Sequence, residues 1–174
     1  GEITEEEKKE YLSLIVSESD RLIELTANTL MLDRLGANSL EVEKKEFSLS
    51  ETARKEILIL QDKWESKNIE VEAELNEVTV ISNPELVGQM ILNVMENAVK
   101  YTPENGKITV TDGKTADGVF LTIKDDGIGM DDETKRRMFD RYYRGDKSRQ
   151  KGGNGLGLAT VKKIAEVLGV KISV

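Results

Sequence analysis

The apolar residues near the start of the chain recur at spacings that fit one face of a helix. Between residues 5 and 35 the successive spacings are 3, 7, 3, 7 and 3. The residues that form this stripe are Leu12, Ile15, Leu22, Leu25, Leu32 and Leu35. The pattern predicts one long helix with a narrow apolar seam, as in coiled coils and helical bundles. Because Ser19 and Thr29 interrupt the stripe, it favours a bundle, and Gly36 is predicted to end the helix.

The remaining apolar positions predict short strands that alternate with helices. Alternating or continuous apolar runs predict strands at residues 40–48, 68–75, 77–82, 106–113, 118–126 and 170–174. Helical spacing predicts helices at residues 48–66, 83–101, 131–144 and 156–168. Ser48 with Glu51 has the pattern of a capping box, and Asn83 followed by Pro84 has that of a helix start. The second and third strands are expected to flank a turn at Asn76.

This order of elements predicts a helical segment followed by a domain in which helices cover a sheet. We expect an α/β (α+β) two-layer sandwich with a mixed, mostly antiparallel sheet and helices on one face, preceded by a long N-terminal helix. The composition changes near residues 36–45. The expected boundaries are therefore a helical segment at 1–36, a linker at 37–45 and the sandwich at 46–174.

Composition then restricts the chemistry. The 174 residues carry a net charge of −8 and include neither cysteine nor histidine. This excludes disulfides, thiolate metal sites and histidine zinc ligands, so a bound metal would need hard oxygen ligands, as Mg²⁺ does. The acidic charge argues against nucleic acid as the main partner. No apolar run approaches the roughly 20 residues of a membrane span, and no signal peptide opens the chain. We expect a cytoplasmic protein, or a fragment of a membrane-anchored one.

Three polar stretches could bind a ligand, and the first lies on the predicted helix 83–101. At about 100° per residue, Asn93, Asn97 and Lys100 fall within an arc of roughly 60° beside the apolar face. Amide oxygens suit a hard cation and an ammonium suits a phosphate, so the set fits a nucleotide with Mg²⁺. The alternative is an ordinary polar face turned to solvent.

The other two stretches are rich in glycine. Asp125 ends a predicted strand and is followed by Gly127 and Gly129, so its carboxylate could accept a hydrogen bond from the exocyclic amine of adenine in an apolar pocket. A simple Asp-Gly turn is the alternative. Four glycines lie before and at the start of the last helix: Gly152, Gly153, Gly155 and Gly157. They would let a phosphate approach the N–H groups at the helix start, whereas the plain alternative is a flexible loop.

Taken in order, the three stretches have the pattern N-x-x-x-N-A-x-K-Y, D-x-G-x-G and G-x-G-L-G-L. The set resembles the ATP-binding catalytic domain shared by sensor histidine kinases, DNA gyrase, the mismatch-repair protein MutL and the ninety-kilodalton chaperones. Residues 93–101 match the asparagine box, 125–129 the first glycine box and 153–158 the second. Residues 138–144, "MFDRYYR", match the phenylalanine box of histidine kinases in particular. The resemblance covers about residues 47–174.

The resemblance implies roles for individual residues. It implies catalytic roles for Asn93, Lys100 and Arg144, the last two through contacts with phosphates. It implies Mg²⁺ coordination by Asn97 with help from Asn93. The residues that it places around ATP are Asn97, Tyr101, Asp125, Gly127, Gly129, Gly153, Gly155, Leu156 and Gly157. In this arrangement Asp125 binds the adenine amine, Tyr101 packs near the adenine or ribose, and a lid at 145–155 opens and closes over the phosphates.

Residues 18–35 look like the second helix of the histidine kinase dimerisation hairpin. In that family the first helix carries the phosphoacceptor histidine, and since this chain has none, we expect that helix upstream. The resemblance implies a homodimeric kinase that transfers the γ-phosphoryl group of ATP to a histidine, for relay to an aspartate of a response regulator. A serine kinase of the anti-sigma type and an ATPase such as gyrase remain alternatives.

Two departures from the family pattern are visible. Leu168 stands where many histidine kinases have a histidine. The chain also stops at Val174, one strand short of the closing hairpin of the family, which predicts an exposed sheet edge.

Overall fold

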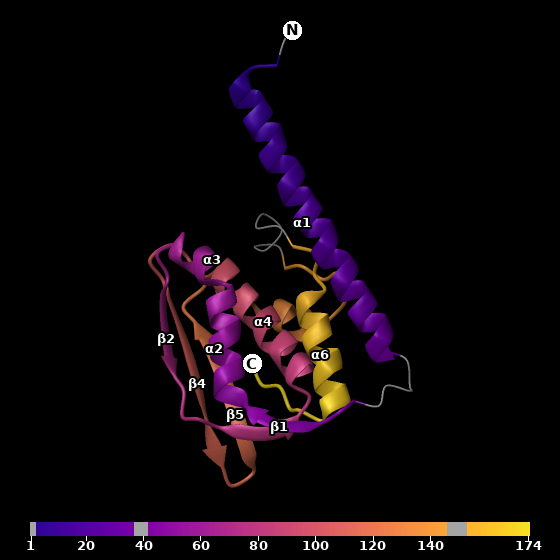
Figure 1. Ribbon diagram of the computed structural model, residues 1–174, viewed down its shortest axis with the longest axis vertical. Coiled ribbons are helices and arrows are strands. Elements are labelled where there is room, and N and C mark those ends of the chain that lie inside the picture. The colour runs from indigo at the N-terminus through magenta and orange to yellow at the C-terminus, as the bar shows by residue number, and fades with distance from the viewer. Residues whose placement is uncertain (1–2, 37–41, 146–152) are drawn as a thin grey trace.

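The computed structural model describes residues 3–36, 42–145 and 153–174. The long helix α1 (Glu5–Gly36) projects from a body of helices and strands, as Figure 1 shows. The single long helix and its end at Gly36 are confirmed. Only its C-terminal end is buried, where Leu32 and Leu35 are 3% and 5% exposed. Leu35 packs with Leu86 and Ile164 of the body, whereas the apolar seam farther up the helix lies exposed.

In the part of the chain that the structure describes, five strands form two small sheets. Their bounds are β1 (Lys45–Ser48), β2 (Glu70–Glu74), β3 (Thr79–Ser82), β4 (Lys107–Thr115) and β5 (Gly118–Asp125). β1 pairs antiparallel with β3. The other sheet has the order β2-β4-β5, in which β2 runs parallel to β4 and β5 runs antiparallel to it. A mixed, mostly antiparallel arrangement is therefore confirmed. β2 and β3, which are neighbours in sequence, belong to different sheets.

The helices of the body lie together against the strands (Figure 1). Their bounds are α2 (Leu49–Ile59), α3 (Gln61–Glu65), α4 (Pro84–Tyr101), α5 (Asp132–Arg137) and α6 (Gly157–Leu168). The largest core cluster joins α2, α4 and β4, where Met95, Ile108 and Val110 are fully buried. Both predicted caps are confirmed. Ser48 accepts from the Glu51 N–H at 3.1 Å, and Asn83 accepts from the Leu86 N–H at 2.9 Å.

Two predicted helices are too long. The helix predicted at 48–66 breaks at buried Leu60, which has φ −98° and ψ 10° and separates α2 from α3. At the break the Ile57 carbonyl accepts from the Leu60 N–H at 3.2 Å and from Trp64 Nε1 at 3.2 Å. The helix predicted at 131–144 ends at Arg137, because residues 138–144 turn instead and Tyr142 adopts φ +63°.

The strand predicted at residues 170–174 is wrong. The chain leaves α6 through Gly169 in the left-handed conformation and continues without a strand to Val174. A strand needs a partner, and within the described residues the outer edge of β5 pairs with no other strand. The alternating apolar residues Val170, Ile172 and Val174 are accordingly 45%, 39% and 73% exposed. The expected exposed sheet edge is thus present at β5.

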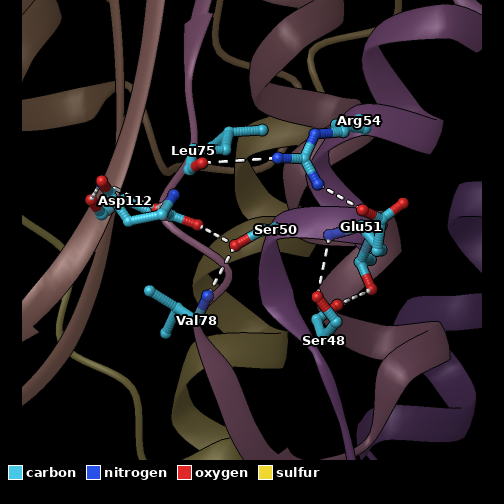
Figure 2. Close-up of polar contacts among 9 residues, drawn as sticks. Ser48, Ser50, Glu51, Arg54, Leu75, Val78 and Asp112 are labelled. Carbon is cyan, nitrogen blue, oxygen red and sulfur yellow. Dashed lines mark hydrogen bonds and ion pairs between the residues drawn. The ribbon is translucent and has the colours of Figure 1, made fainter.

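A buried polar network holds the turn between β2 and β3 onto β4 (Figure 2). Asp112 is 3% exposed and accepts from the hydroxyl of Ser50, which in turn accepts from the Val78 N–H at 2.8 Å. The other Asp112 oxygen accepts from the Asn76 N–H at 2.6 Å. The predicted turn at Asn76 is therefore fixed by a carboxylate that lies far from it in sequence.

A second acidic group, Glu56, is buried between α2 and α4. The residue is 7% exposed, and a Cβ at Gly88 would lie 3.0 Å from its Oε1. Burial raises the pKa of Glu56, partly offset by the charge of Lys55. The folded chain thus holds this proton more tightly than the unfolded chain, so stability falls as the pH rises from about 4.5 through the raised folded-state pKa.

We therefore expect Glu56→Gln to stabilise the chain at neutral pH and to flatten the pH dependence of its unfolding free energy. Urea unfolding at a series of pH values measures both effects. Glu104→Gln is the matched control, because Glu104 is exposed. If a change from acidic to neutral pH lowered the unfolding free energy of the wild-type and Glu56→Gln chains equally, the raised pKa of Glu56 would be contradicted.

Candidate functional site

The two asparagines of α4 face the start of α6. Asn93 is 3% exposed, and Asn97 Nδ2 donates to the Asn93 carbonyl at 3.0 Å, which leaves the Asn97 Oδ1 as an acceptor. A Cβ at Gly157, the first residue of α6, would lie 3.6 Å from Asn93 Oδ1 and 3.9 Å from Asn97 Nδ2. Within the described residues, Asn93 Nδ2 is buried without a hydrogen-bond partner. The amides thus meet the first turn of α6.

The first turn of α6 has no side-chain cap. Leu156, the N-cap residue, makes no side-chain hydrogen bond and is fully buried. Its own N–H donates to Asn154 Oδ1 at 3.0 Å. The N–H groups that follow are the ones a helix leaves without backbone partners, so an anion can approach them. Asn154 was not among the predicted residues, although asparagine two positions before a helix is a usual turn signal.

The last turn of α4 presents Lys100 and Tyr101. Lys100 Nζ lies 4.9 Å from the centroid of the Tyr101 ring. A Cβ at Gly153, which has φ +96°, would lie 2.5 Å from the same Nζ. The left-handed backbone favours glycine at this position, where the segment before α6 passes the end of the lysine side chain. This contact places a positive charge beside the approach to the α6 N-terminus.

The turn after β5 packs against the end of the same helix. The Gly127 N–H donates to Asp125 Oδ1 at 2.9 Å. A Cβ at Gly127 would lie 3.0 Å from the Tyr101 carbonyl oxygen, and Gly129 has φ +64°. Asp125 is exposed, as are the apolar side chains of Ile128 and Met130. The carboxylate thus sits at an open apolar surface rather than in a closed pocket.

The segment after α5 reaches the start of α6 through Gly155. The Tyr142 N–H donates to the Gly155 carbonyl at 3.0 Å, and Gly155 has φ +70°. A Cβ at Gly155 would lie 2.8 Å from the Tyr142 carbonyl carbon. Arg144, two residues farther, is half-buried, and the Tyr143 ring lies 4.3 Å from the Arg137 guanidinium. The predicted residues therefore gather around the ends of α4 and α6.

Part of the predicted site cannot be placed. Gly152 and most of the predicted lid, residues 146–152, lie outside the described residues. Over the ranges that the structure describes, no group of three His, Cys, Asp or Glu side chains could hold a metal ion. No helix in those ranges is long and apolar enough to cross a membrane.

Comparison with known proteins identifies the family and the fold. Residues 82–174 match the family described as "Histidine kinase-, DNA gyrase B-, and HSP90-like ATPase". The circadian input-output histidine kinase CikA of Synechococcus elongatus is 31% identical over 180 residues, which cover 100% of this chain and 24% of CikA. A crystal structure of full-length ShkA in complex with AMPPNP matches with a TM-score of 0.79 at 26% identity, covering 97% of this chain and 35% of that chain.

A further crystal structure, of histidine kinase ThkA in complex with the response regulator protein TrrA, matches with a TM-score of 0.75 at 25% identity. It covers 96% of this chain and 46% of that chain. Together, the fold, the site and these relatives define an ATP-binding catalytic domain of the histidine kinase type. The chain belongs to the family of histidine kinase-, DNA gyrase B- and HSP90-like ATPases. It spans about a quarter of the length of CikA.

Proposed function

We propose that this chain binds ATP with Mg²⁺ between the ends of α4 and α6 and transfers the γ-phosphoryl group to a histidine on a dimerisation hairpin. The observation that supports this most is the meeting of two amides with an uncapped helix start. Asn93, Asn97 and Gly157 come from segments about 60 residues apart, and Asn93 Nδ2 is buried without a partner among the described residues. Burying an amide N–H without an acceptor costs free energy, and a ligand that accepts this hydrogen bond would remove that cost.

The side chains fit a bound Mg²⁺ and a triphosphate. Asn97 Oδ1 remains an acceptor because its Nδ2 is held by the Asn93 carbonyl, and amide oxygens are suitable ligands for a hard cation. When bound, Mg²⁺ would neutralise part of the charge on the phosphates. Lys100, beside Gly153, and Arg144 would contact phosphate oxygens. The N–H groups at the start of α6 would hold the phosphates from the other side.

We place the adenine at the turn after β5. One oxygen of Asp125 is held by the Gly127 N–H, which leaves the other to accept from the adenine amine. Gly127 and Gly129 shape this turn, and the Tyr101 ring would pack near the adenine or ribose. In this proposal the base and the phosphates contact the same last turn of α4.

The proposed transfer is a displacement at phosphorus. An imidazole nitrogen of the acceptor histidine forms a bond to the γ-phosphorus while the bond to the bridging oxygen breaks, and ADP leaves with that electron pair. The phosphorylated ring gives its N–H proton to water, and a response-regulator aspartate later takes the phosphoryl group. The residues of this chain act by positioning and charge stabilisation. Since ATP is a cytoplasmic substrate, we place the reaction in the cytoplasm.

We further propose that α1 is the second helix of a dimerisation hairpin, that residues 37–45 link it to the catalytic domain at 46–174, and that the longer protein is a homodimer. The support is the apolar seam that α1 exposes. Leu12, Ile15 and Leu22 are 62%, 61% and 61% exposed. Such a stripe is unfavourable in water and suits packing against further helices.

Kinase chemistry is favoured over ATP hydrolysis by the identity of residue 93. The family resemblance implies that members which hydrolyse ATP carry, four residues before the metal-binding asparagine, a glutamate that activates water, whereas residue 93 of this chain is an asparagine. An amide does not accept a proton, and a positioned general base contributes about 10²–10⁴-fold. Slow phosphate release by this chain is therefore expected.

The proposal is tested by incubating the chain with γ-labelled ATP, with and without a separate dimerisation hairpin that carries the acceptor histidine. We expect labelling of the hairpin only, through an acid-labile bond. A hairpin with His→Gln at the acceptor is the control and should stay unlabelled. Rapid phosphate release by the chain alone, or label on the chain itself, would place it in another branch of the family.

A further inference from the structure

We propose that Lys67, which lies outside every sequence box, is a positioning residue for the nucleotide site because its ammonium holds the last turn of α4. This inference rests on the proposed function. Lys67 Nζ donates to the Val99 carbonyl at 2.5 Å, to the Lys100 carbonyl at 3.4 Å, and to the Thr102 carbonyl. One ammonium thus spans the turn that presents Lys100 and Tyr101.

The end of α4 needs such a partner. The last four carbonyls of a helix have no intrahelical N–H, and a glycine in the left-handed conformation commonly satisfies them. Here the C-cap is Thr102, with φ −65° and ψ 133°, and Pro103 follows, which has no N–H to give. A cation at this end also matches the sign of the helix dipole. Lys67 therefore takes the place of a glycine cap.

The position of the ammonium is itself fixed by the backbone around it. The Lys67 carbonyl accepts from the Asn105 N–H at 3.0 Å, and Asn68 Nδ2 donates to Asn105 Oδ1 at 2.7 Å. Lys67 is half-buried, and the Glu70 N–H donates to the Gly106 carbonyl at 2.9 Å, which starts the pairing of β2 with β4. The turn before β2 is thus tied to the turn after α4.

The site lies on the other side of the same turn. The Tyr101 carbonyl contacts Gly127, whose N–H holds Asp125, and Lys100 Nζ lies against Gly153. A last turn that frays would move the proposed phosphate contact and the floor of the proposed adenine site together. The expected consequence of losing Lys67 is weaker ATP binding without loss of any direct ligand.

The test is calorimetric titration of Mg²⁺-ATP into the wild-type chain and into Lys67→Met. Loss of charge-assisted hydrogen bonds of this kind corresponds to a change of roughly tenfold in Kd, which we expect to rise by that factor. Lys67→Arg keeps the charge and the donors and should recover most of the affinity. Lys63→Met is the matched control, since Lys63 reaches α4 only through an exposed pair with Glu96 at 3.3 Å.

Two further measurements distinguish a positioning role of Lys67 from a role in stability alone. Asp112→Asn weakens the network that joins α2 and β4, so it should lower the melting temperature yet leave the ATP Kd of the folded chain nearly unchanged. Hydrogen exchange should show faster exchange of the amides of residues 100–102 in Lys67→Met, without ATP. An unchanged Kd and unchanged exchange in Lys67→Met would overturn the inference, whereas failure of the wild-type chain to bind ATP would overturn the proposed function itself.

Discussion

Asp125→Asn is expected to weaken ATP binding by roughly 5–150-fold, the range that corresponds to leaving the adenine amine unpaired once the bound base covers Asp125, which is exposed in the free chain. The reason is that the two carboxylate oxygens of Asp125 have different partners. One accepts from the Gly127 N–H at 2.9 Å, and the other is the proposed acceptor for the adenine amine. Asparagine has one neutral oxygen, which is a weaker acceptor when it is shared between the Gly127 N–H and the adenine amine, and its other end is an NH₂ donor that would face the amine unfavourably.

Calorimetric titration of Mg²⁺-ATP measures this effect, and a comparison with GTP sharpens it. Guanine presents a carbonyl where adenine presents its amine, so the wild-type carboxylate should reject GTP while Asp125→Asn should discriminate less. Asp117→Asn is the control, because Asp117 is an exposed aspartate at the other end of the β4–β5 pair. Equal affinities of the wild-type and Asp125→Asn chains for ATP would refute the adenine assignment.

Gly155→Ala is expected to reduce both stability and ATP affinity strongly. Gly155 has φ +70°, a conformation that costs an ordinary residue roughly 1–2 kcal/mol. Its Cβ would also lie 2.8 Å from the Tyr142 carbonyl carbon and 2.9 Å from the Tyr143 carbonyl oxygen. Both are backbone atoms, so the segment that carries Arg144 would have to move away from α6. We expect an affinity loss of at least about tenfold, the factor that 1.4 kcal/mol represents.

Gly157→Ala is the matched substitution two residues away. Its Cβ would make ordinary contact with Asn93 Oδ1 at 3.6 Å, and alanine favours a helix over glycine by roughly 0.5–1 kcal/mol. The melting temperature should therefore rise slightly in Gly157→Ala, whereas it should fall in Gly155→Ala. Thermal unfolding and calorimetry on both variants measure the contrast. If both substitutions lowered the melting temperature equally, the left-handed backbone of Gly155 and its contact with Tyr142 would not explain the effect of Gly155→Ala.

The sequence predicted the elements whose signals are local. The caps at Ser48 and Asn83 and the hairpin of β4 with β5 depend on neighbouring residues, and they are present. The asparagine box and both glycine boxes lie on or beside α4, β5 and α6, elements that were predicted correctly. The role of these residues in binding a nucleotide stays a prediction.

The predictions that are wrong depend on distant partners. The break at Leu60 follows from burial of that residue and from the bond of Trp64 to the Ile57 carbonyl. The turn at residues 138–144 follows from the contact of Tyr142 with Gly155, which lies beyond the predicted lid. Residues 170–174 alternate like a strand, yet alternation does not supply a neighbouring strand. Lys67 was missed because a lysine in a turn is ordinarily a surface charge.

The parallel pairing of β2 with β4 has a consequence for how the chain folds. The first paired residues, Glu70 and Lys107, are 107 − 70 = 37 positions apart, and α4 lies in the connection between them. To form this pairing the chain must close a long loop, and it loses conformational entropy before the stabilising contacts form. Pairing of this kind therefore slows folding. The helix that carries the asparagines lies within that loop and packs on β4. Competence to bind a nucleotide should consequently emerge in the slow, final phase of refolding, together with the sheet and not with the early formation of helix.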